Sequence, residues 1–253
     1  MVPSGEREAV ELFQLRFLQM IGAELRDRVA VKGGCNLRFF FGSPRYSEDI
    51  DLDVSITRGD TLAKNVEKIL TRLDPLLRAS KITISKQTPD PGEATQRWKI
   101  HLSQEGFATP FHTKIEFSRR HATEKFEPAD VEYTQVPREI AARYELQPVR
   151  AVHYRLPAAI RQKIVALAKR KETQARDVFD LSLLLSRSNA EPVLTAEIES
   201  LRHEAIERAR SLSYREFESQ VVAYLLPEMQ GAHDEYTWEY MQEDVVKAIE
   251  SLT

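Results

Sequence analysis

Three aspartates, Asp49, Asp51 and Asp53, alternate with apolar residues in a single short segment. In a β-strand, such alternation places the three carboxylates on one face and the apolar side chains on the other. Neighbouring carboxylates repel one another unless a cation lies between them, and Mg²⁺ prefers hard carboxylate oxygens together with water and phosphate. We therefore expect a divalent-metal site at Asp49 and Asp51. An exposed acidic strand face is the alternative, and Asp53 is the acid that we expect to be structural.

A diglycine, Gly33-Gly34, precedes this acidic segment. It follows a short expected strand at residues 29–31 and precedes an expected helix at residues 35–41. Glycine permits close approach of the backbone, and the first amides of a helix attract phosphate. A diglycine before a helix is commonly a plain turn, but here an acidic strand follows it. The combination predicts that the turn receives the phosphates of a metal-bound nucleotide.

The elements that must position these residues form an α/β arrangement in the first half of the chain. Apolar residues spaced three and four apart predict amphipathic helices at residues 6–27 and 61–79. Segments rich in residues that favour strands, separated by turn residues, complete a mixed sheet. The expected strands lie at residues 29–31, 49–54, 82–86, 98–102 and 111–117.

The second half of the chain is expected to be almost entirely helical. Prolines interrupt the pattern between residues 119 and 149, so we place the domain boundary there. The expected domains are a core at residues 1–125 and a mainly helical domain at residues 126–253. Helices are expected at residues 157–170, 173–186, 195–212, 214–225 and 235–252.

Composition limits the classes of function. The chain has 253 residues, of which 42% are hydrophobic and 30% charged, as in ordinary globular proteins. It contains one cysteine, and its N-terminal helix carries too many charges for a signal peptide, so we expect a cytoplasmic protein without membrane attachment. A net charge of −3 means that a nucleic acid must bind a local basic surface. The residues at 163–176 include such a basic cluster, although a solvated helix face would also explain it.

Four segments, in order, resemble the nucleotidyltransferase toxins of the AbiEii/AbiGii type, which are relatives of the mycobacterial MenT toxins of type IV toxin–antitoxin systems. The first two are KGGCNLR at residues 32–38 and RYSEDIDL at residues 45–52. KIEF at 114–117 is similar to a later strand of the family, and KIVALAKR at 163–170 with RDVFDL at 176–181 is similar to its helical motif. The resemblance implies a minimal DNA-polymerase-β-like nucleotidyltransferase core followed by a helical lobe.

The resemblance also implies site residues. Asp49 and Asp51 would be catalytic and hold Mg²⁺ or Mn²⁺, with Glu116 as a third metal-facing acid. Lys163 would contact the triphosphate, and Asp177 occupies the acidic catalytic position of the second lobe. Glu116 could instead pair with Lys114 or with a neighbouring strand.

A further set of residues is implied to bind the nucleotide. Cys35 stands where the family commonly has serine or threonine, and because a thiol is a poor donor to phosphate we expect the backbone amide to make that contact. The helical acids could instead be ordinary surface acids, but nearby basic residues favour a polar cluster between the lobes. The implied nucleotide-binding residues are Gly33, Gly34, Cys35, Arg38, Ser47, Arg170, Arg176 and Asp180.

The expected reaction is transfer of a nucleoside monophosphate from an NTP to an acceptor hydroxyl. By resemblance, the acceptor is the 3′ end of tRNA, whose modification blocks translation, and the protein has a cognate antitoxin. Transfer to a protein hydroxyl, such as that of the antitoxin, is the second possibility. A non-catalytic module that binds NTP or sequesters a partner is the third.

Overall fold

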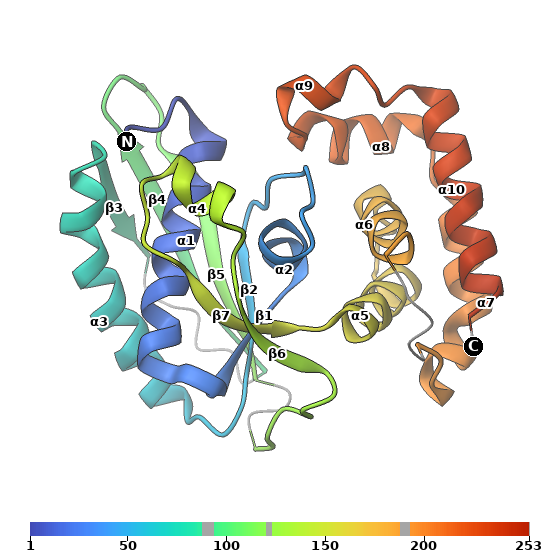
Figure 1. Cartoon of the computed structure of the whole chain (residues 1–253), viewed down its shortest axis with the longest axis horizontal. Coiled ribbons are helices and arrows are strands. Elements are labelled where there is room, and N and C mark those ends of the chain that lie inside the picture. Colours follow the sequence, from blue (N-terminus) through green and yellow to red (C-terminus); the bar gives the residue numbers. More distant parts are fainter. Residues whose placement is uncertain (88–93, 120–122, 188–192, 253) are drawn as a thin grey trace. The chain divides into compact units, whose positions relative to one another are not determined.

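The computed structural model describes residues 1–87, 94–119, 123–187 and 193–252, and it divides the chain into two compact units (Figure 1). The first unit comprises Met1–Phe40 and Ser47–Tyr154 and contains the sheet. The second comprises Phe41–Tyr46 and Arg155–Thr253 and contains the C-terminal helices. Each unit has its own buried side chains, as expected of separate compact bodies.

A seven-stranded mixed sheet, in the order β3-β4-β5-β2-β1-β7-β6, forms the first unit. The central strand β2 runs antiparallel to β1 and parallel to β5, and β1 runs parallel to β7. The outer pairs β3–β4, β4–β5 and β6–β7 are antiparallel. The strands are β1 (Val29–Lys32), β2 (Ile50–Val54), β3 (Ile82–Lys86), β4 (Thr95–Gln104), β5 (Phe111–Ser118), β6 (Val131–Gln135) and β7 (Arg150–Tyr154).

The five expected strands are present, and β6 and β7 are additional. β6 lies in the stretch between residues 119 and 149 where prolines interrupt the pattern, and β7 directly follows that stretch. Because β7 pairs with β1, and β6 pairs with β7, the sheet continues to Tyr154. The division into compact units accordingly falls after Tyr154, later than the expected division after residue 125.

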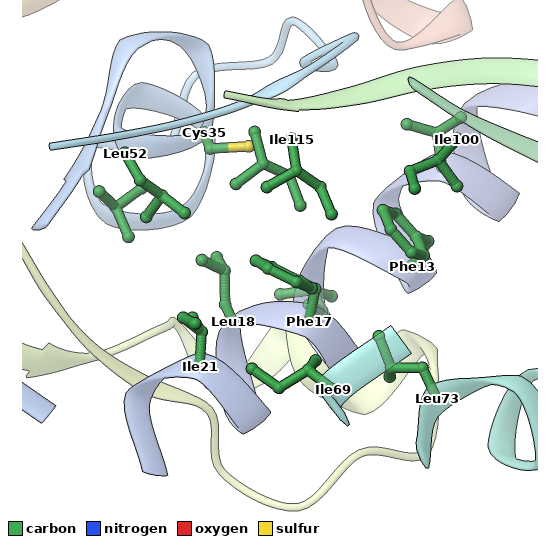
Figure 2. Close-up of a cluster of buried hydrophobic side chains, with 14 of the residues drawn as sticks. Phe13, Phe17, Leu18, Ile21, Cys35, Leu52, Ile69, Leu73, Ile100 and Ile115 are labelled. Carbon is green, nitrogen blue, oxygen red and sulfur yellow. The ribbon is translucent and has the colours of Figure 1, made fainter. Parts of the chain in front are cut away.

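One face of the sheet is covered by the long helices α1 (Glu6–Leu25) and α3 (Gly59–Arg78), which pack against each other (Figure 1). The short helix α2 (Gly33–Phe40) adds Cys35 and Phe39 to the same core. Figure 2 shows the α1 side chains between strand residues and α3 residues. Burial of these side chains supplies the main driving force for folding of this unit. The labelled core residues are Phe13, Phe17, Leu18, Ile21, Cys35, Leu52, Ile69, Leu73, Ile100 and Ile115.

The other face of the sheet carries the alternate residues of each strand, which are mostly polar. On β2, Ile50, Leu52 and Val54 enter the core, so Asp51 and Asp53 point to the opposite face. On β4 and β5, burial alternates in the same way, with charged residues on the face opposite the core. We call this polar face the open face.

The second unit is helical. It contains α5 (Leu156–Lys169), α6 (Ala175–Leu185), α7 (Ala196–Ser211), α8 (Tyr214–Gln220), α9 (Pro227–Gln230) and α10 (Glu235–Glu250). Phe217 and Trp238 stack in its core with ring centroids 4.6 Å apart. The segment Phe41–Tyr46 joins this unit through backbone hydrogen bonds to the chain near Leu225.

The expected helices are present with differences at their ends. One expected helix is shorter than predicted, and two short helices are additional. The helix expected at residues 214–225 ends at Gln220 and continues as a 3₁₀ turn at Val222–Tyr224. The short helices α4 (Arg138–Arg143) and α9 were not expected, because one or two turns leave no clear periodicity. None of the described helices is long and apolar enough to cross a membrane.

The core of the sheet unit can be tested at Phe17, which is fully buried between Phe13 and Phe117. Replacing Phe17 by alanine should lower the free energy of unfolding by about 3–5 kcal/mol, because a cavity remains where the ring was. Urea unfolding followed through Trp98 fluorescence, in a Trp238→Phe background, measures this change. Tyr133→Ala, at a side chain that is 61% exposed, is the control and should change the free energy little. Equal losses in the two variants would contradict the assigned core.

Candidate active site

A row of charged residues crosses the open face at the level of Asp51. In the strand register, Asp51 of β2 lies opposite Lys32 of β1 on one side and opposite Glu116 of β5 on the other. Glu116 in turn lies opposite Arg97 of β4. Paired residues of adjacent strands project to the same face. The sheet therefore aligns two acids in the centre of the row with one cation at each end.

Asp49 immediately precedes β2, and its environment is closely defined. One carboxylate oxygen accepts a hydrogen bond from the Lys114 backbone N–H, and the other accepts one from the Lys114 ammonium, both at 2.9 Å. The Ser47 hydroxyl and the Cys35 thiol both donate to the Asp49 carbonyl, at 2.9 and 3.2 Å. Side chains from two other parts of the chain thus fix the backbone that presents the Asp49 carboxylate.

Gly33 approaches the Asp51 carboxylate so closely that an added Cβ would force one of the two to shift. Its φ is +62°, in the left-handed region that side chains disfavour. A Cβ at this position would lie 2.6 Å from Asp51 Oδ2. With Gly33 and Gly34, α2 begins directly beside the acid, so its first amides lack helical partners next to Asp51. The expected adjacency of the glycine turn and the acidic strand is therefore present.

Asp53 has partners within the sheet unit that match the structural role expected for it. The Lys32 ammonium lies 2.5 Å from one of its oxygens, and the Tyr154 hydroxyl donates to the other at 2.7 Å. Asp53 itself is buried. Burial and the charge of Asp53 raise the pKa of Tyr154. Asp53 therefore joins β2 to β1 and β7.

Glu116 pairs with Arg97, whose guanidinium nitrogens lie 2.7 and 2.6 Å from Glu116 Oε2. In the parts of the chain that the structure describes, no three His, Cys, Asp or Glu side chains are grouped to hold a metal ion. Asp49, Asp51 and Glu116 thus do not form a closed three-acid site. Two carboxylates at the start of β2 still fit Mg²⁺, which usually takes one or two carboxylates and completes its shell with water and phosphate.

Two residues expected to bind nucleotide have side chains committed to other contacts. The Cys35 thiol is fully buried, and burial raises its pKa. Arg38 is buried against α1, where its Nε lies 2.5 Å from Glu11 Oε1, and the Tyr144 hydroxyl donates to the same carboxylate. A nucleotide contact by Arg38 would require this buried pair to break. At Cys35, only the backbone amide remains for the expected phosphate contact.

The helical unit contains a buried ionic cluster around Lys163 of α5. Its ammonium donates to Asp177 Oδ1 at 3.0 Å and to Asp180 Oδ2 at 2.5 Å, both on α6. Arg170 Nε donates to Asp177 Oδ2 at 2.7 Å. Asp177 and Asp180 are fully buried and Lys163 nearly so. The structure thus brings together four residues of the expected helical motif within one unit.

Asp177 of this cluster is held in the charged form by its neighbours. At Asp177, burial opposes ionisation, but the attraction and hydrogen bonds of Lys163 and Arg170 outweigh it, and the net effect lowers the pKa. Arg45 lies 3.4 Å from Asp180 Oδ2. Asp180 Oδ1 has no hydrogen-bond partner among the described residues. Arg176, which we expected to support the site, is partly buried at the start of α6 and has contacts of its own.

Sequence reasoning assigned no site role to the cations that the structure places beside the acids, and it named Lys114 only as a possible partner of Glu116, whereas Lys114 pairs with Asp49. These partners come from other strands or distant segments, so spacing along the chain could not identify them. Two signals were nevertheless available, since one arginine begins the acidic motif at residue 45 and one lysine directly precedes the diglycine. The residues concerned are Lys32, Arg45, Arg97 and Lys114.

The close approach at Gly33 generates a stability prediction. Gly33→Ala should lower the free energy of unfolding by at least about 1–2 kcal/mol, because alanine in the left-handed region is strained and its Cβ would displace Asp51. Gly231→Ala is the control, since Gly231 has φ −70° and no atom within 4 Å of an added Cβ. Thermal and urea unfolding measure both variants. A Gly33→Ala protein as stable as the control would show that the close approach is not required.

The Lys163 cluster generates a second prediction. Lys163→Met leaves two buried carboxylates without their shared cation and should cost about 3–5 kcal/mol of unfolding free energy. Lys169→Met, on the same helix, removes only an exposed ion pair with Glu197 and should cost less than about 1 kcal/mol. Trp238 fluorescence during urea unfolding reports on this unit. Similar losses in the two variants would refute the assigned burial of the cluster.

Comparison with known proteins identifies the family. Two solved structures share the fold: a candidate nucleotidyltransferase from Helicobacter pylori (TM-score 0.59, covering 100% of this chain and 99% of that chain) and JHP933 from the same organism (TM-score 0.53, covering 99% and 95%). Each is 16% identical, so they support the α/β fold class and no more. No curated protein matches the sequence. The model of the family described as nucleotidyl transferase AbiEii toxin, type IV toxin–antitoxin system, matches residues 16–251. The chain therefore belongs to the AbiEii nucleotidyltransferase toxin family, as the four sequence segments predicted.

Proposed function

We propose that this AbiEii-family nucleotidyltransferase is Mg²⁺-dependent and transfers a nucleoside monophosphate from an NTP to the 3′ end of tRNA. One observation carries the proposal: the Asp51 carboxylate lies against the left-handed Gly33 turn, two residues from the fixed Asp49 carboxylate. A metal-binding pair of acids and a phosphate-binding backbone turn are thereby combined in one place. Blocking the tRNA end would stop aminoacylation and account for toxicity.

In this proposal, residues of the sheet unit position the nucleotide. Asp49 and Asp51 hold the metal, for which Mn²⁺ could substitute, and the backbone amides from Gly33 to Cys35 receive the phosphates. Ser47 acts mainly through the Asp49 carbonyl, which its hydroxyl already contacts. When bound, the metal neutralises phosphate charge and lowers the pKa of the attacking hydroxyl. Glu116 would join the site only after release from Arg97.

In the reaction, the acceptor oxygen forms a bond to the α-phosphorus, and the bond from this phosphorus to the bridging oxygen of the leaving group breaks. The acceptor hydroxyl loses its proton, and pyrophosphate leaves. Lys163 would contact the triphosphate, since an ammonium has three donors and the described aspartates occupy two of them. Asp177 and Asp180 would orient the Lys163 ammonium through their hydrogen bonds, and Arg170 and Arg176 would support the same task.

The proposal also assigns the protein its partners and its cellular location. The family implies an antitoxin and an NTP substrate, and both tRNA and NTPs are available in the cytoplasm, where we place the protein. Transfer to a protein hydroxyl is the second candidate reaction, because the acids and the glycine turn would serve either acceptor. A partner-sequestering module without turnover is less well supported, because the acidic pair and the glycine turn are both intact.

The central test is Asp51→Asn. This change keeps the volume of the side chain but removes the charge that holds the metal, and it should reduce transfer by more than about a hundredfold, beyond the usual cost of losing a residue that only orients a ligand. Asp53→Asn is the matched control on the same strand face. It should lower stability through loss of the Lys32 ion pair, while folded protein retains transfer. Full transferase activity in Asp51→Asn would refute the proposal.

The acceptor is tested by incubating the wild-type protein with Mg²⁺ and labelled NTPs, separately with total tRNA and with cellular protein. Label at the 3′ end of tRNA is the expected result. Label on protein alone would replace tRNA by a protein acceptor. Absence of pyrophosphate release with every NTP and acceptor would favour the sequestering module.

A further inference from the structure

The open face of β4 and β5 carries two successive pairs of residues of like type. In the register of these strands, Lys99 lies directly opposite Lys114, and His101 lies directly opposite His112. The two histidine rings contact each other edge to face, with centroids 4.6 Å apart. We call these four residues the basic strip. Its lysine end reaches the candidate active site, because Lys114 contacts Asp49.

The strip is accessible, and Lys114 is the one of its four residues for which the described residues provide an acidic partner. Lys99, His112 and Lys114 are exposed, and His101 is half-buried. Lys114 is paired with Asp49, but Lys99 and the two histidines have no acidic partner among the described residues. Arg97, the next residue on this face of β4, is paired with Glu116. Asp49 and Glu116, two acids beside the strip, are thus paired with Lys114 and Arg97 respectively.

Folding alone does not explain this arrangement. Cations placed directly opposite each other on neighbouring strands are unfavourable, and opposite charges there would stabilise the sheet. The chain uses such complementary pairing elsewhere on the same strands, at Arg97 and Glu116. The lysine pair beside the active site is accounted for if an anionic ligand lies over it, and the adjoining histidines can donate hydrogen bonds to the same ligand. With a net charge of −3, the chain must concentrate positive charge locally to bind a polyanion.

The chemistry of the surrounding surface favours a nucleic acid over a protein. Protein interfaces are centred on buried aromatic or aliphatic anchors, whereas nucleic-acid interfaces are polar and positively charged. The open face of β3, β4 and β5 offers hydrogen-bonding groups and no apolar anchor. Its residues are Thr83, Ser85, Arg97, Lys99, His101, Ser103, His112, Lys114 and Glu116.

We propose that the basic strip binds the sugar-phosphate backbone of the RNA acceptor and leads its 3′ end to Asp49 and Asp51. This inference rests on the proposed function and identifies where the acceptor lies. Positions two residues apart on a strand are separated by roughly 7 Å. Lys99 and His101 could thus contact consecutive phosphates of an extended strand. Such contacts are independent of base sequence, so the strip would give affinity and direction without selecting a tRNA.

The test compares Lys99→Gln and the triple variant Lys99→Gln, His101→Gln, His112→Gln with the wild type. Lys114 is left unchanged because it contacts Asp49. The control triple, Lys64→Gln, Lys68→Gln and Arg72→Gln, removes three exposed cations from α3, which covers the opposite face of the sheet. Fluorescence anisotropy measures binding of total tRNA and of single-stranded RNA at several salt concentrations. Thermal shift with NTP and Mg²⁺ measures nucleotide binding separately.

The strip triple should bind RNA at least about tenfold more weakly, because hydrogen bonds to charged phosphates are lost. The slope of log affinity against log salt should fall by about 1 in Lys99→Gln, as expected for one phosphate contact. Nucleotide binding should stay at the wild-type level in both variants. The control triple should keep most of the wild-type RNA affinity.

Three results would overturn the inference. Unchanged RNA affinity and salt slope in the strip triple, with tRNA still labelled, would reject the strip and leave the proposed function intact. Wild-type protein that labels protein and does not bind RNA would show that the acceptor is not RNA. Failure of the wild type to bind or transfer any NTP would reject the proposed function itself, and the inference with it.

Discussion

The structure of the sheet unit depends on compensation of the negative charge on one face of β2. Asp49, Asp51 and Asp53 occupy alternate positions, and each unpaired carboxylate in such a set raises the energy of the others. Cations from neighbouring strands compensate two of these charges: Lys114 pairs with Asp49, and Lys32 pairs with Asp53. At Asp51, the register neighbours are Lys32 and the carboxylate of Glu116, and the Gly33 backbone lies against it. The charge of Asp51 thus lies directly beside the left-handed turn at Gly33.

The helical unit also contains acids whose negative charge is compensated by nearby cations. Two aspartates one turn apart on α6 are fully buried, which would be costly if either were unpaired. Lys163 bridges both of them, and Arg170 and Arg45 add further positive charge. A cluster of this kind orients the Lys163 ammonium with little freedom, as the triphosphate contact proposed for it would require. Because the same contacts stabilise the helices, loss of activity on changing Lys163 alone would not separate chemistry from folding.

Ionic pairing also distinguishes structural from functional charges on the open face. Where two strands present opposite charges, as at Arg97 and Glu116, pairing within the fold accounts for both residues. Where they present like residues, as in the basic strip, an external anion is the missing partner. The acids and the strip are continuous through the contact of Lys114 with Asp49. A nucleotidyl acceptor and a metal-bound nucleotide would thus be held by adjoining parts of one sheet.

The sequence by itself determined the parts of this protein that depend on local pattern. The five principal strands, the long helices, the acidic alternation at residues 49–53 and the glycine turn all follow from periodicity and residue type, and the four motif segments identified the family. Only the tertiary structure decided which charges are neutralised. Arg38 pairs with Glu11, Tyr154 with Asp53 and Arg97 with Glu116 across long stretches of chain. It also decided that β6 and β7 belong to the sheet. Prolines at residues 128, 137 and 148 interrupt the pattern around these strands, and the pairing of β7 with β1 and of β6 with β7 is a tertiary contact.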